Sequence, residues 1–221
     1  KILFFIINLI VSYPFVCAQD WPQLSRYSER NKQLGLPSKN EHRVVFMGNS
    51  ITEGWSTIFP EFFEGKQYIN RGISGQTTPQ MLIRFRPDVI DLKPKVVLIL
   101  AGINDIAGNT GPSTVKMISD NIISMAELAN ANNIKVIISS ILPAKDFPWS
   151  PDMNPPPKIL AVNEIIEEYA KANNMIYLDY YSSMVDKNFA LIENYGSDGV
   201  HPNRKGYQVM SSLADKAINE I

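Results

Sequence analysis

The chain has 221 residues, 45% apolar and 19% charged, which suits one globular domain with a substantial core better than two small domains. Lys and Arg total 21 against 22 Asp and Glu, so the formal net charge is -1. This balance provides no basic surplus for a nucleic-acid partner and no long run of like charges typical of solvated tails.

Residues 1–18 have the layout of a secretory signal peptide. A Lys opens the segment, an apolar stretch interrupted only by Asn8, Ser12 and Pro14 follows, and the small residue Ala18 ends it. The apolar stretch is shorter than the roughly 20 residues that a membrane-spanning helix needs. We therefore expect residues 19–221 to form a single mature domain that is secreted or periplasmic, without stable insertion in the membrane.

Cys17 is the only cysteine, so the chain contains no second cysteine for an intrachain disulfide. Lipidation of Cys17, which would tether the protein to a membrane, is the alternative to cleavage before Gln19. The residues from Tyr13 to Val16 are bulky where lipoprotein signals prefer small side chains. Removal of the whole leader is therefore the favoured prediction.

Strand-like and helix-like segments alternate after the leader. Runs rich in Val, Ile and Leu predict strands, and apolar residues spaced by three or four predict helices. The strands are expected over residues 42–48, 67–73, 95–102, 134–143 and 175–182, and the helices over residues 77–92, 111–133, 155–174 and 203–221. This alternation predicts a parallel sheet of five strands with helices on both of its faces.

Two of these segments carry the strongest patterns. Residues 95–102 are nearly continuous in Val, Ile and Leu, as expected for a strand that is covered on both faces. Residues 111–133 place their apolar side chains on one helical stripe. The Pro-rich segment 142–158 lies between a predicted strand and its helix, so we interpret it as a long loop within one domain.

Unusual polar residues stand where the predicted strands end and near the end of the chain. They occur in Gly48-Asn49-Ser50, in residues 72–78 (GISGQTT), in residues 102–105 (GIND) and in residues 195–203 (YGSDGVHPN). Ligands of open α/β sheets bind at the carboxyl ends of the strands. Any chemistry is therefore expected at these segments.

The histidine count restricts which residue could activate a serine nucleophile. The chain contains only His42 and His201, and His42 precedes the first predicted strand, at the wrong end of the sheet. Asp198 lies three residues before His201, with Gly199 allowing a tight turn between them. A carboxylate at this spacing can hold the imidazole Nδ1–H and leave Nε2 to accept the proton of Ser50.

Each of these residues also has a purely structural interpretation. Ser50, with Glu53 three residues later, matches the capping box at the start of a helix. Asp-Gly at residues 198–199 is a common turn, and Asp105 could cap the segment that follows it. The catalytic interpretation is favoured because all these residues are expected at one edge of one sheet.

The blocks GNSIT, GISGQTT, GIND and DGVH, in this order, resemble the SGNH hydrolases, also called the GDSL family of esterases and lipases. The resemblance spans residue 46 to the last helix and is closest to bacterial carbohydrate acetylesterases and relatives of platelet-activating-factor acetylhydrolase. It implies a flavodoxin-like α/β/α sandwich of three layers. It also implies Ser50 as the nucleophile, His201 as the base and Asp198 as the acid that orients the base.

The same resemblance assigns the oxyanion hole to the backbone N–H groups of Ser50 and Gly75 and to the side chain of Asn104. Asn49 departs from the family, whose name block has Asp before the serine. Because that side chain is not assigned a proton transfer, activity is still expected. The absence of G-x-S-x-G from the sequence argues against the nucleophile elbow of the α/β-hydrolases.

The sequence offers no cofactor motif. It has one Cys, two His and no cluster with metal-ligand spacing, and it lacks G-x-G-x-x-G and the P-loop. A serine hydrolase needs neither a metal nor a nucleotide, so we expect no cofactor.

The loop 142–158 is expected to border the same edge and to select the substrate. Phe147 and Trp149 could form a wall for a sugar ring or an acyl chain, or could pack the loop onto its own domain. Trp55 and Tyr195 are further aromatic candidates. No long apolar segment could shelter a fatty acyl chain, which favours short esters, acetyl above all, on a small molecule or glycan.

Three functions follow from this sequence. The first is an exported serine esterase that releases short acyl groups, most plausibly acetyl groups from carbohydrate. The second is a lysophospholipase or acyl-thioesterase of the same fold. The third, a non-catalytic glycan-binding protein, conflicts with the presence of Ser50, Asn104, Asp198 and His201.

Overall fold

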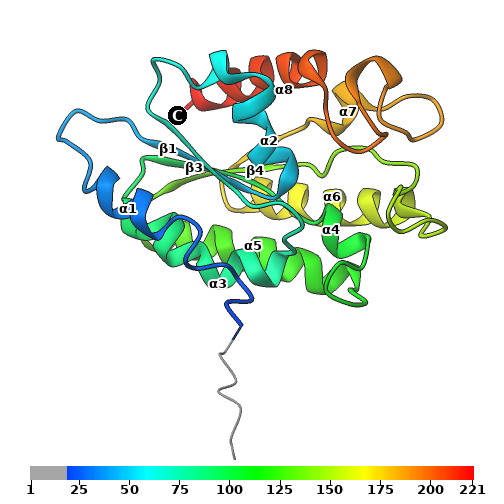
Figure 1. Ribbon diagram of the computed structural model, residues 1–221, viewed down its shortest axis with the longest axis horizontal. Helices are drawn as coiled ribbons and strands as arrows, with labels where there is room; N and C mark the ends of the chain where they lie inside the picture. Colours follow the sequence, from blue (N-terminus) through cyan, green and yellow to red (C-terminus); the bar gives the residue numbers. More distant parts are fainter. Residues whose placement is uncertain (1–18) are drawn as a thin grey trace, which may run out of the picture.

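A parallel sheet forms the middle layer of the protein in a computed structural model that describes residues 19–221 (Figure 1). The signal peptide predicted for residues 1–18 lies outside the described residues. The five strands are β1 (Val44–Gly48), β2 (Tyr68–Gly72), β3 (Val96–Leu100), β4 (Lys135–Ser139) and β5 (Ile176–Leu178), in the order β2-β1-β3-β4-β5. This order is that of the flavodoxin-like folds, so the predicted fold class is confirmed.

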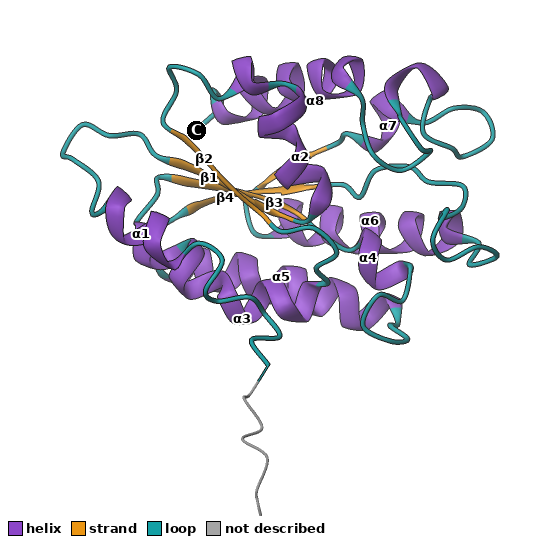
Figure 2. Ribbon diagram, viewed as in Figure 1, coloured by secondary structure: helices purple, strands orange, loops and turns teal. Residues whose placement is uncertain are grey.

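Helices cover both faces of the sheet (Figure 2). One face carries α3 (Thr78–Asp88), α5 (Val115–Ala131) and α6 (Pro155–Ala172), and the other carries α2 (Ser50–Ile58) and α8 (Arg204–Ile218). The shorter helices are α1 (Ser28–Leu34), α4 (Ile103–Ile106) and α7 (Tyr181–Met184), with 3₁₀ turns at Pro60–Phe62, Ile90–Leu92 and Glu193–Tyr195. Between residues 19 and 221, no helix combines the length and apolarity needed to cross a membrane.

The register of the central strands aligns their carboxyl ends. Gly48 at the end of β1 lies opposite Gly72 of β2 and Leu100 of β3. Every residue of β1 and β3 is buried, as expected for strands with helices on both faces. The segments that follow β1, β2 and β3 therefore start side by side at one edge of the sheet.

Local sequence signals explain where the helices begin. The side chain of Thr114 accepts a hydrogen bond from the backbone N–H of Met117 at 3.1 Å and so caps α5. Three prolines open α6, in the first turn, where the missing N–H groups would have no helical partner. The helix predicted over residues 77–92 ends at Asp88, one residue after Pro87, and continues as a 3₁₀ turn.

An aromatic cluster fills the space between the sheet and the layer of α2 and α8. Phe46 of β1 packs edge-on against Trp55 and Phe62, with 5.6 Å between ring centroids in each pair. Trp55 is fully buried, and its Nε1 donates to the hydroxyl of Ser211 at 3.1 Å. The suggestion that Trp55 contacts substrate is therefore wrong, because its ring belongs to the core.

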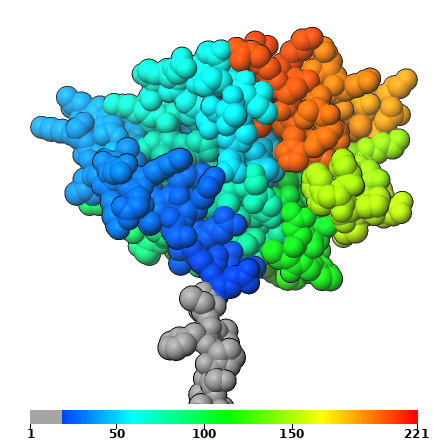
Figure 3. Space-filling model, viewed as in Figure 1, coloured from blue at the N-terminus to red at the C-terminus, as the bar shows by residue number. Residues whose placement is uncertain are grey.

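The N-terminal segment, residues 19–34, lies on the outside of the domain against α3 (Figure 3, blue). Gln80 of α3 donates a hydrogen bond to the backbone carbonyl of Trp21 at 2.7 Å. Tyr27 is 4% exposed, and its hydroxyl donates to the carbonyl of Gly72 at the end of β2. Although α1 itself buries no residue, the segment is thus attached to the domain by buried polar contacts.

Candidate active site

Ser50 is the first residue of α2, directly after the turn that ends β1. The cap of α2 is Asn49, whose side-chain oxygen accepts a hydrogen bond from the backbone N–H of Ile51 at 3.2 Å. The interpretation of Ser50 as the helix cap is therefore wrong. Because Asn49 performs that role, the Ser50 hydroxyl is available for another partner. Its backbone N–H lies at the positive end of the helix dipole.

Gly48 allows α2 and β3 to approach each other closely before Ser50. A Cβ atom at this position would lie 1.9 Å from Oγ1 of Thr52 and 2.9 Å from the carbonyl oxygen of Leu100. Both contacts are too short to exist, so only glycine fits between α2 and β3. The close approach sets the position of the serine relative to the neighbouring strand.

Ser50, His201 and Asp198 form a continuous hydrogen-bonded chain. The hydroxyl oxygen of Ser50 lies 2.9 Å from Nε2 of His201, and Nδ1 of His201 lies 2.7 Å from Oδ2 of Asp198. The serine and the histidine are 151 residues apart in sequence. The structure thus brings the three predicted catalytic residues together in the order that a serine hydrolase requires.

The turn 198–201 orients the carboxylate. Oδ1 of Asp198 accepts hydrogen bonds from the backbone N–H groups of Val200 and His201, at 3.0 and 2.7 Å. Burial raises the pKa of Asp198, but these hydrogen bonds and the imidazole contact lower it by a larger amount. The pKa of Asp198 therefore lies below its ordinary value. Gly199 has φ +85°, a conformation that glycine adopts readily. The carboxylate therefore stays ionised beside the imidazole near neutral pH.

Two predicted oxyanion donors lie in neighbouring segments, one in the loop after β2 and one in the short helix after β3. We call residues 72–76 the oxyanion loop; within it, Gly75 has φ +78°. Asn104 is 2% exposed and belongs to α4, which follows β3. One of its two amide N–H groups donates to the backbone carbonyl of Gln76 at 2.9 Å. That bond orients the side chain and leaves the second N–H for another acceptor.

Glu53 braces the oxyanion loop against α2. Its Oε2 accepts from the backbone N–H of Ser74 at 2.8 Å and also from the Ser74 hydroxyl, and its Oε1 accepts from Arg26 at 2.7 Å. Burial raises the pKa of Glu53, but the bonds from Ser74 and Arg26 outweigh that effect and lower it. The capping box predicted from Glu53 is wrong, because the carboxylate binds the next loop instead of the start of its own helix.

A cavity of about 330 Å³ lies at this edge, lined by Ser50, Ser74, Gly75, Asn104, Asn109, Trp149 and His201. The predicted nucleophile, base and oxyanion donors therefore share one hollow. His42 lines a different hollow, with Val96 at the start of β3, at the amino ends of the strands. The prediction that only His201 can serve Ser50 agrees with this placement.

The structure separates the two aromatic residues predicted to contact substrate. Trp149 is 43% exposed and lines the cavity, with its ring centroid 5.8 Å from that of His201. Phe147 has no exposed surface and packs against Trp149 at a centroid distance of 5.4 Å. Phe147 therefore supports the wall from behind and contributes no surface to the cavity.

Asn109 also lines the cavity, although no sequence pattern predicts it. Its side-chain oxygen accepts from Nε1 of Trp149 at 3.2 Å, and its amide donates to the carbonyl of Gly75 at 3.2 Å. One side chain thus links the aromatic wall to the oxyanion loop. No motif marks it, because its role depends on how two distant loops meet. Within residues 19–221, no group of three or more His, Cys, Asp or Glu is arranged to hold a metal.

A family model of the GDSL-like lipases and acylhydrolases matches residues 46–209. The chain belongs to this family. The membership predicted from the four sequence blocks is therefore confirmed. The protein is therefore a relative of lipases and acylhydrolases. In such a family, a serine that is hydrogen-bonded to a histidine, as Ser50 is, is a candidate nucleophile.

Solved structures of the family resemble this chain over most of its length. A GDSL-like lipase from Bacteroides thetaiotaomicron VPI-5482 is 51% identical, with a TM-score of 0.88 over 90% of this chain and 98% of that one. A Bacteroides fragilis NCTC 9343 protein assigned as an acylhydrolase is also 51% identical, with a TM-score of 0.90 over 91% and 98%. The acetyl xylan esterase AlAXEase shares the fold, at 20% identity and a TM-score of 0.67 over 79% and 98%.

Two curated relatives are more distant. Lipoprotein YqeF of Bacillus subtilis (strain 168) is 29% identical over 126 residues, which cover 49% of this GDSL-family chain and 52% of YqeF. An acetylxylan esterase of Xylanibacter ruminicola is 24% identical over 225 residues, which cover 85% of this chain and 45% of the esterase. The chain thus spans about half the length of the curated relatives it matches.

Proposed function

We propose that this GDSL-family protein is a serine esterase that hydrolyses short acyl esters, acetyl esters in particular, carried by a carbohydrate. The observation that carries the proposal is the chain of contacts from Ser50 through His201 to Asp198, 2.9 and 2.7 Å long, beside a cavity of about 330 Å³. This arrangement has a nucleophile, a base for its proton and an anion that stabilises the protonated base.

The reaction would proceed through an acyl-enzyme. Ser50 Oγ attacks the ester carbonyl while Nε2 of His201 takes the hydroxyl proton, and Asp198 stabilises the imidazolium. The carbonyl oxygen becomes an oxyanion that accepts hydrogen bonds from the backbone N–H groups of Ser50 and Gly75 and from the amide of Asn104. His201 then protonates the leaving alkoxide. A water molecule, activated by the same imidazole, hydrolyses the acyl-enzyme and restores Ser50.

The size of the cavity supports a short acyl group. Ser74 and Gly75 give it a lining of small residues on one side, and the indole of Trp149 bounds it on another. A long acyl chain would need an extended apolar channel, and a cavity of about 330 Å³ is small for one. The exposed face of Trp149 suits stacking against a sugar ring. The acetylxylan esterase of Xylanibacter ruminicola among the relatives agrees with an acetylated glycan as the substrate.

We further propose that residues 1–18 are an export signal and that residues 19–221 form the mature domain. The lipoprotein YqeF among the relatives keeps lipidation of Cys17 as the alternative. Mass spectrometry of the mature N-terminus separates the two. A free or cyclised Gln19 supports removal of the leader, whereas a diacylglycerol-modified Cys17 supports a lipid-anchored enzyme.

A chain-length series of p-nitrophenyl esters tests the acyl preference. We expect kcat/KM to be highest for acetate and to fall as the acyl chain lengthens. A preference for long chains would sink the short-acyl proposal and favour the lysophospholipase or thioesterase of the same fold. Acetate release from a panel of acetylated glycans then identifies the natural scaffold.

A fluorophosphonate probe tests whether the protein is an enzyme at all. We expect the probe to label Ser50 in the folded wild-type protein and to leave Ser50→Ala unlabelled. If the folded wild type stays unlabelled, the non-catalytic glycan-binding function becomes the better explanation.

A further inference from the structure

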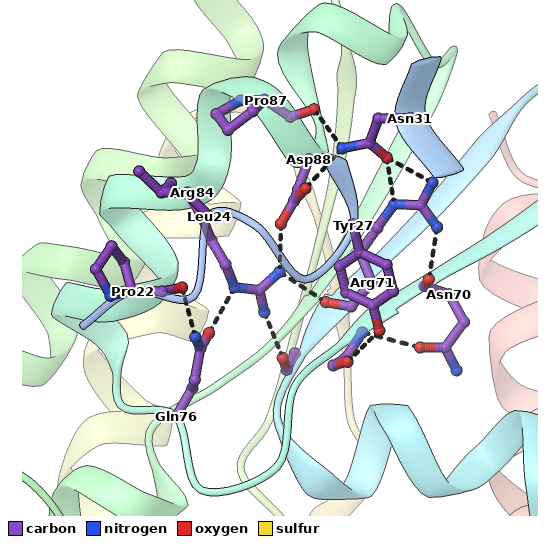
Figure 4. Close-up of polar contacts among 12 residues, drawn as sticks. Pro22, Leu24, Tyr27, Asn31, Asn70, Arg71, Gln76, Arg84, Pro87 and Asp88 are labelled. Atoms are coloured by element: carbon purple, nitrogen blue, oxygen red, sulfur yellow. Dashed lines mark hydrogen bonds and ion pairs between the residues drawn. The ribbon is translucent and has the colours of Figure 1, made fainter. Parts of the chain in front are cut away.

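Arg84 of α3 is fully buried, and its guanidinium forms hydrogen bonds to four partners (Figure 4). Its Nε donates to the side-chain oxygen of Gln76, and its Nη2 donates to the backbone carbonyl of Gly48 at 2.9 Å. Its Nη1 donates to the backbone carbonyl of Arg71 at 2.9 Å and to the carboxylate of Asp88 at 3.0 Å. Three of the four partners belong to, or adjoin, the turns that carry the candidate catalytic groups.

These three partners adjoin the oxyanion loop and the turn of residues 48–50, which we call the nucleophile turn. Arg71 immediately precedes the oxyanion loop, and Gln76 is the last residue of that loop. Gly48 lies two residues before Ser50, and its carbonyl also accepts the backbone N–H of Ile73 at 3.1 Å. One planar group therefore connects the nucleophile turn to both ends of the oxyanion loop.

Gln76 extends this connection to Asn104, the predicted side-chain donor of the oxyanion hole. Its side-chain oxygen binds Arg84, while its backbone carbonyl accepts the amide N–H of Asn104 at 2.9 Å. Its own amide donates to the carbonyl of Pro22 at 2.8 Å. Movement of Gln76 would therefore shift both the oxyanion loop and the Asn104 side chain.

A need for stability alone does not explain a charge at this position. Burying a guanidinium is expensive, and well-packed apolar residues often replace a buried ion pair with little loss of stability. Burial lowers the pKa of Arg84, although the nearby Asp88 opposes this effect. An apolar side chain could fill the space. It could not hold the three acceptors on Gln76, Arg71 and Gly48 at fixed angles, as the guanidinium fork does.

We propose that Arg84 is a positioning residue for the esterase reaction, whose guanidinium sets the spacing between Ser50 and the oxyanion donors. The inference rests on the proposed esterase function. Arg84 lies outside the cavity lining and contacts no reacting atom, so it acts through Gly48 and Gln76. Its removal should weaken binding of the transition state more than binding of the ester, because the donors are aimed at the developing oxyanion.

The test compares Arg84→Lys with Arg43→Lys. Lysine keeps the positive charge but lacks the planar fork, so it cannot serve all the acceptors at once. Arg43 is a matched control because it is 1% exposed and binds Glu41, Gly35 and Leu92 at the opposite end of the sheet. Both variants should lose stability, which thermal unfolding measures.

The kinetics on p-nitrophenyl acetate should separate the two variants. We expect Arg84→Lys to lower kcat about 10- to 100-fold with KM changed less than about threefold, as a small displacement of catalytic groups does. Arg43→Lys should keep kcat within about threefold of the wild type. The affinity of Arg84→Lys for an alkyl boronic acid, which mimics the tetrahedral oxyanion, should fall by the same factor as kcat/KM.

Two outcomes overturn the inference while the esterase function stands. They are a wild-type kcat in folded Arg84→Lys, and equal losses of kcat in Arg84→Lys and Arg43→Lys. If Arg84→Lys does not fold, Gln76→Leu removes one acceptor of the guanidinium at similar volume. It should lower kcat about 10-fold, and an unchanged kcat contradicts the proposal. An inactive wild type refutes the proposed function, and this inference falls with it.

Discussion

The reactivity proposed for Ser50 depends on its neighbours, because a serine hydroxyl alone is a weak nucleophile. His201 reaches it from a turn 151 residues further along the chain, and the hydrogen bond measures 2.9 Å. The caps and braces around the serine are made by other residues. Asn49 caps α2, and Glu53 holds Ser74. The Ser50 hydroxyl therefore does not cap the helix and is free to contact His201.

Removing a triad member should leave only residual hydrolysis. We expect Ser50→Ala and His201→Ala each to abolish nearly all turnover of p-nitrophenyl acetate, because these residues act as a unit. Asn104→Ala should reduce kcat by roughly 10²–10³, as the loss of one oxyanion donor does. Circular dichroism checks that the variants are folded. A wild-type rate in either triad variant would refute the assignment.

Trp149 should set the limit on acyl length. Replacing it with alanine removes one wall of the cavity, so longer acyl groups should fit. We expect the ratio of kcat/KM for butyrate to that for acetate to rise about 10-fold in Trp149→Ala. Trp21→Ala is the matched control, since Trp21 is exposed to a similar degree, 41% against 43%, and lies outside the cavity lining. An unchanged butyrate-to-acetate ratio in Trp149→Ala would show that Trp149 does not limit the acyl length.

At the scale of elements, a buried carboxylate joins α4 to the start of α3. Both oxygens of Asp105 accept from the backbone N–H of Thr78 at 3.0 Å, and Oδ1 also accepts from the Thr78 hydroxyl at 2.6 Å. Burial raises the pKa of Asp105 to about 6, although the bonds from Thr78 oppose the increase. The residue after Asn104, the predicted oxyanion donor, thus binds the start of the helix that follows the oxyanion loop.

Asp105 should make stability depend on pH. Its folded pKa of about 6 exceeds the ordinary value of 3.8, so the folded state binds the proton more tightly. This tighter proton binding adds to the free energy of unfolding. The contribution is on the order of 3 kcal/mol, is complete below pH 3.8, and is lost as the pH rises through about 6. Asp105→Asn lacks this titration. In urea unfolding from pH 4 to 7.5, the stability of the wild type minus that of Asp105→Asn should fall, and a constant difference would contradict this.

Most elements could be predicted from the chain because burial leaves a periodic record in sequence. The continuous apolar runs of β1, β3 and β4 and the stripes of α5 and α8 correspond to buried faces. Helix α1 leaves no such record because it buries no side chain. It is held by polar contacts with residues far away in sequence, which no local pattern reveals: Asn31 of α1 accepts from Arg71 and donates to Asp88, and Tyr27 lies just before the helix.

The candidate site divides in the same way. Ser50, Asp198 and His201 stand in short blocks whose chemistry is local, so their proximity could be predicted from the parallel sheet. Asn109 and Arg84 act across loops or helices, and a charged residue in a helix is usually interpreted as solvent-exposed. Nothing in the sequence reveals that the Arg84 guanidinium is buried.

At the scale of the whole molecule, the N-terminal segment is part of the folded domain. One of its anchors is Tyr27, whose hydroxyl donates to the carbonyl of Gly72, immediately before the central residues of the oxyanion loop. Arg71 stacks on the ring of Tyr27, 4.7 Å from its centroid. The segment, β2 and the oxyanion loop should therefore unfold together.

Tyr27→Phe tests this coupling. The change keeps the ring and removes the hydroxyl, which should lower the free energy of unfolding by about 1 kcal/mol, since a buried carbonyl loses its donor. The control is Tyr169→Phe, because the Tyr169 hydroxyl makes only an exposed contact of 3.4 Å with Glu127. We expect a change below about 0.5 kcal/mol there. Equal effects in the two variants would show that the Tyr27 contact has no special weight.

The hydrogen bond from Gln76 to the carbonyl of Pro22 can also transmit force from the N-terminal segment to the candidate site. Any pull on the chain upstream of Trp21 reaches Gln76 and Gln80 through single hydrogen bonds before it reaches a strand of the sheet. A tension applied upstream of Trp21 would therefore load the Trp21–Gln80 contact and then Gln76, whose backbone carbonyl binds the Asn104 amide. In a protein held by its N-terminal end, force would therefore disturb the candidate site before it separates the strands of the sheet.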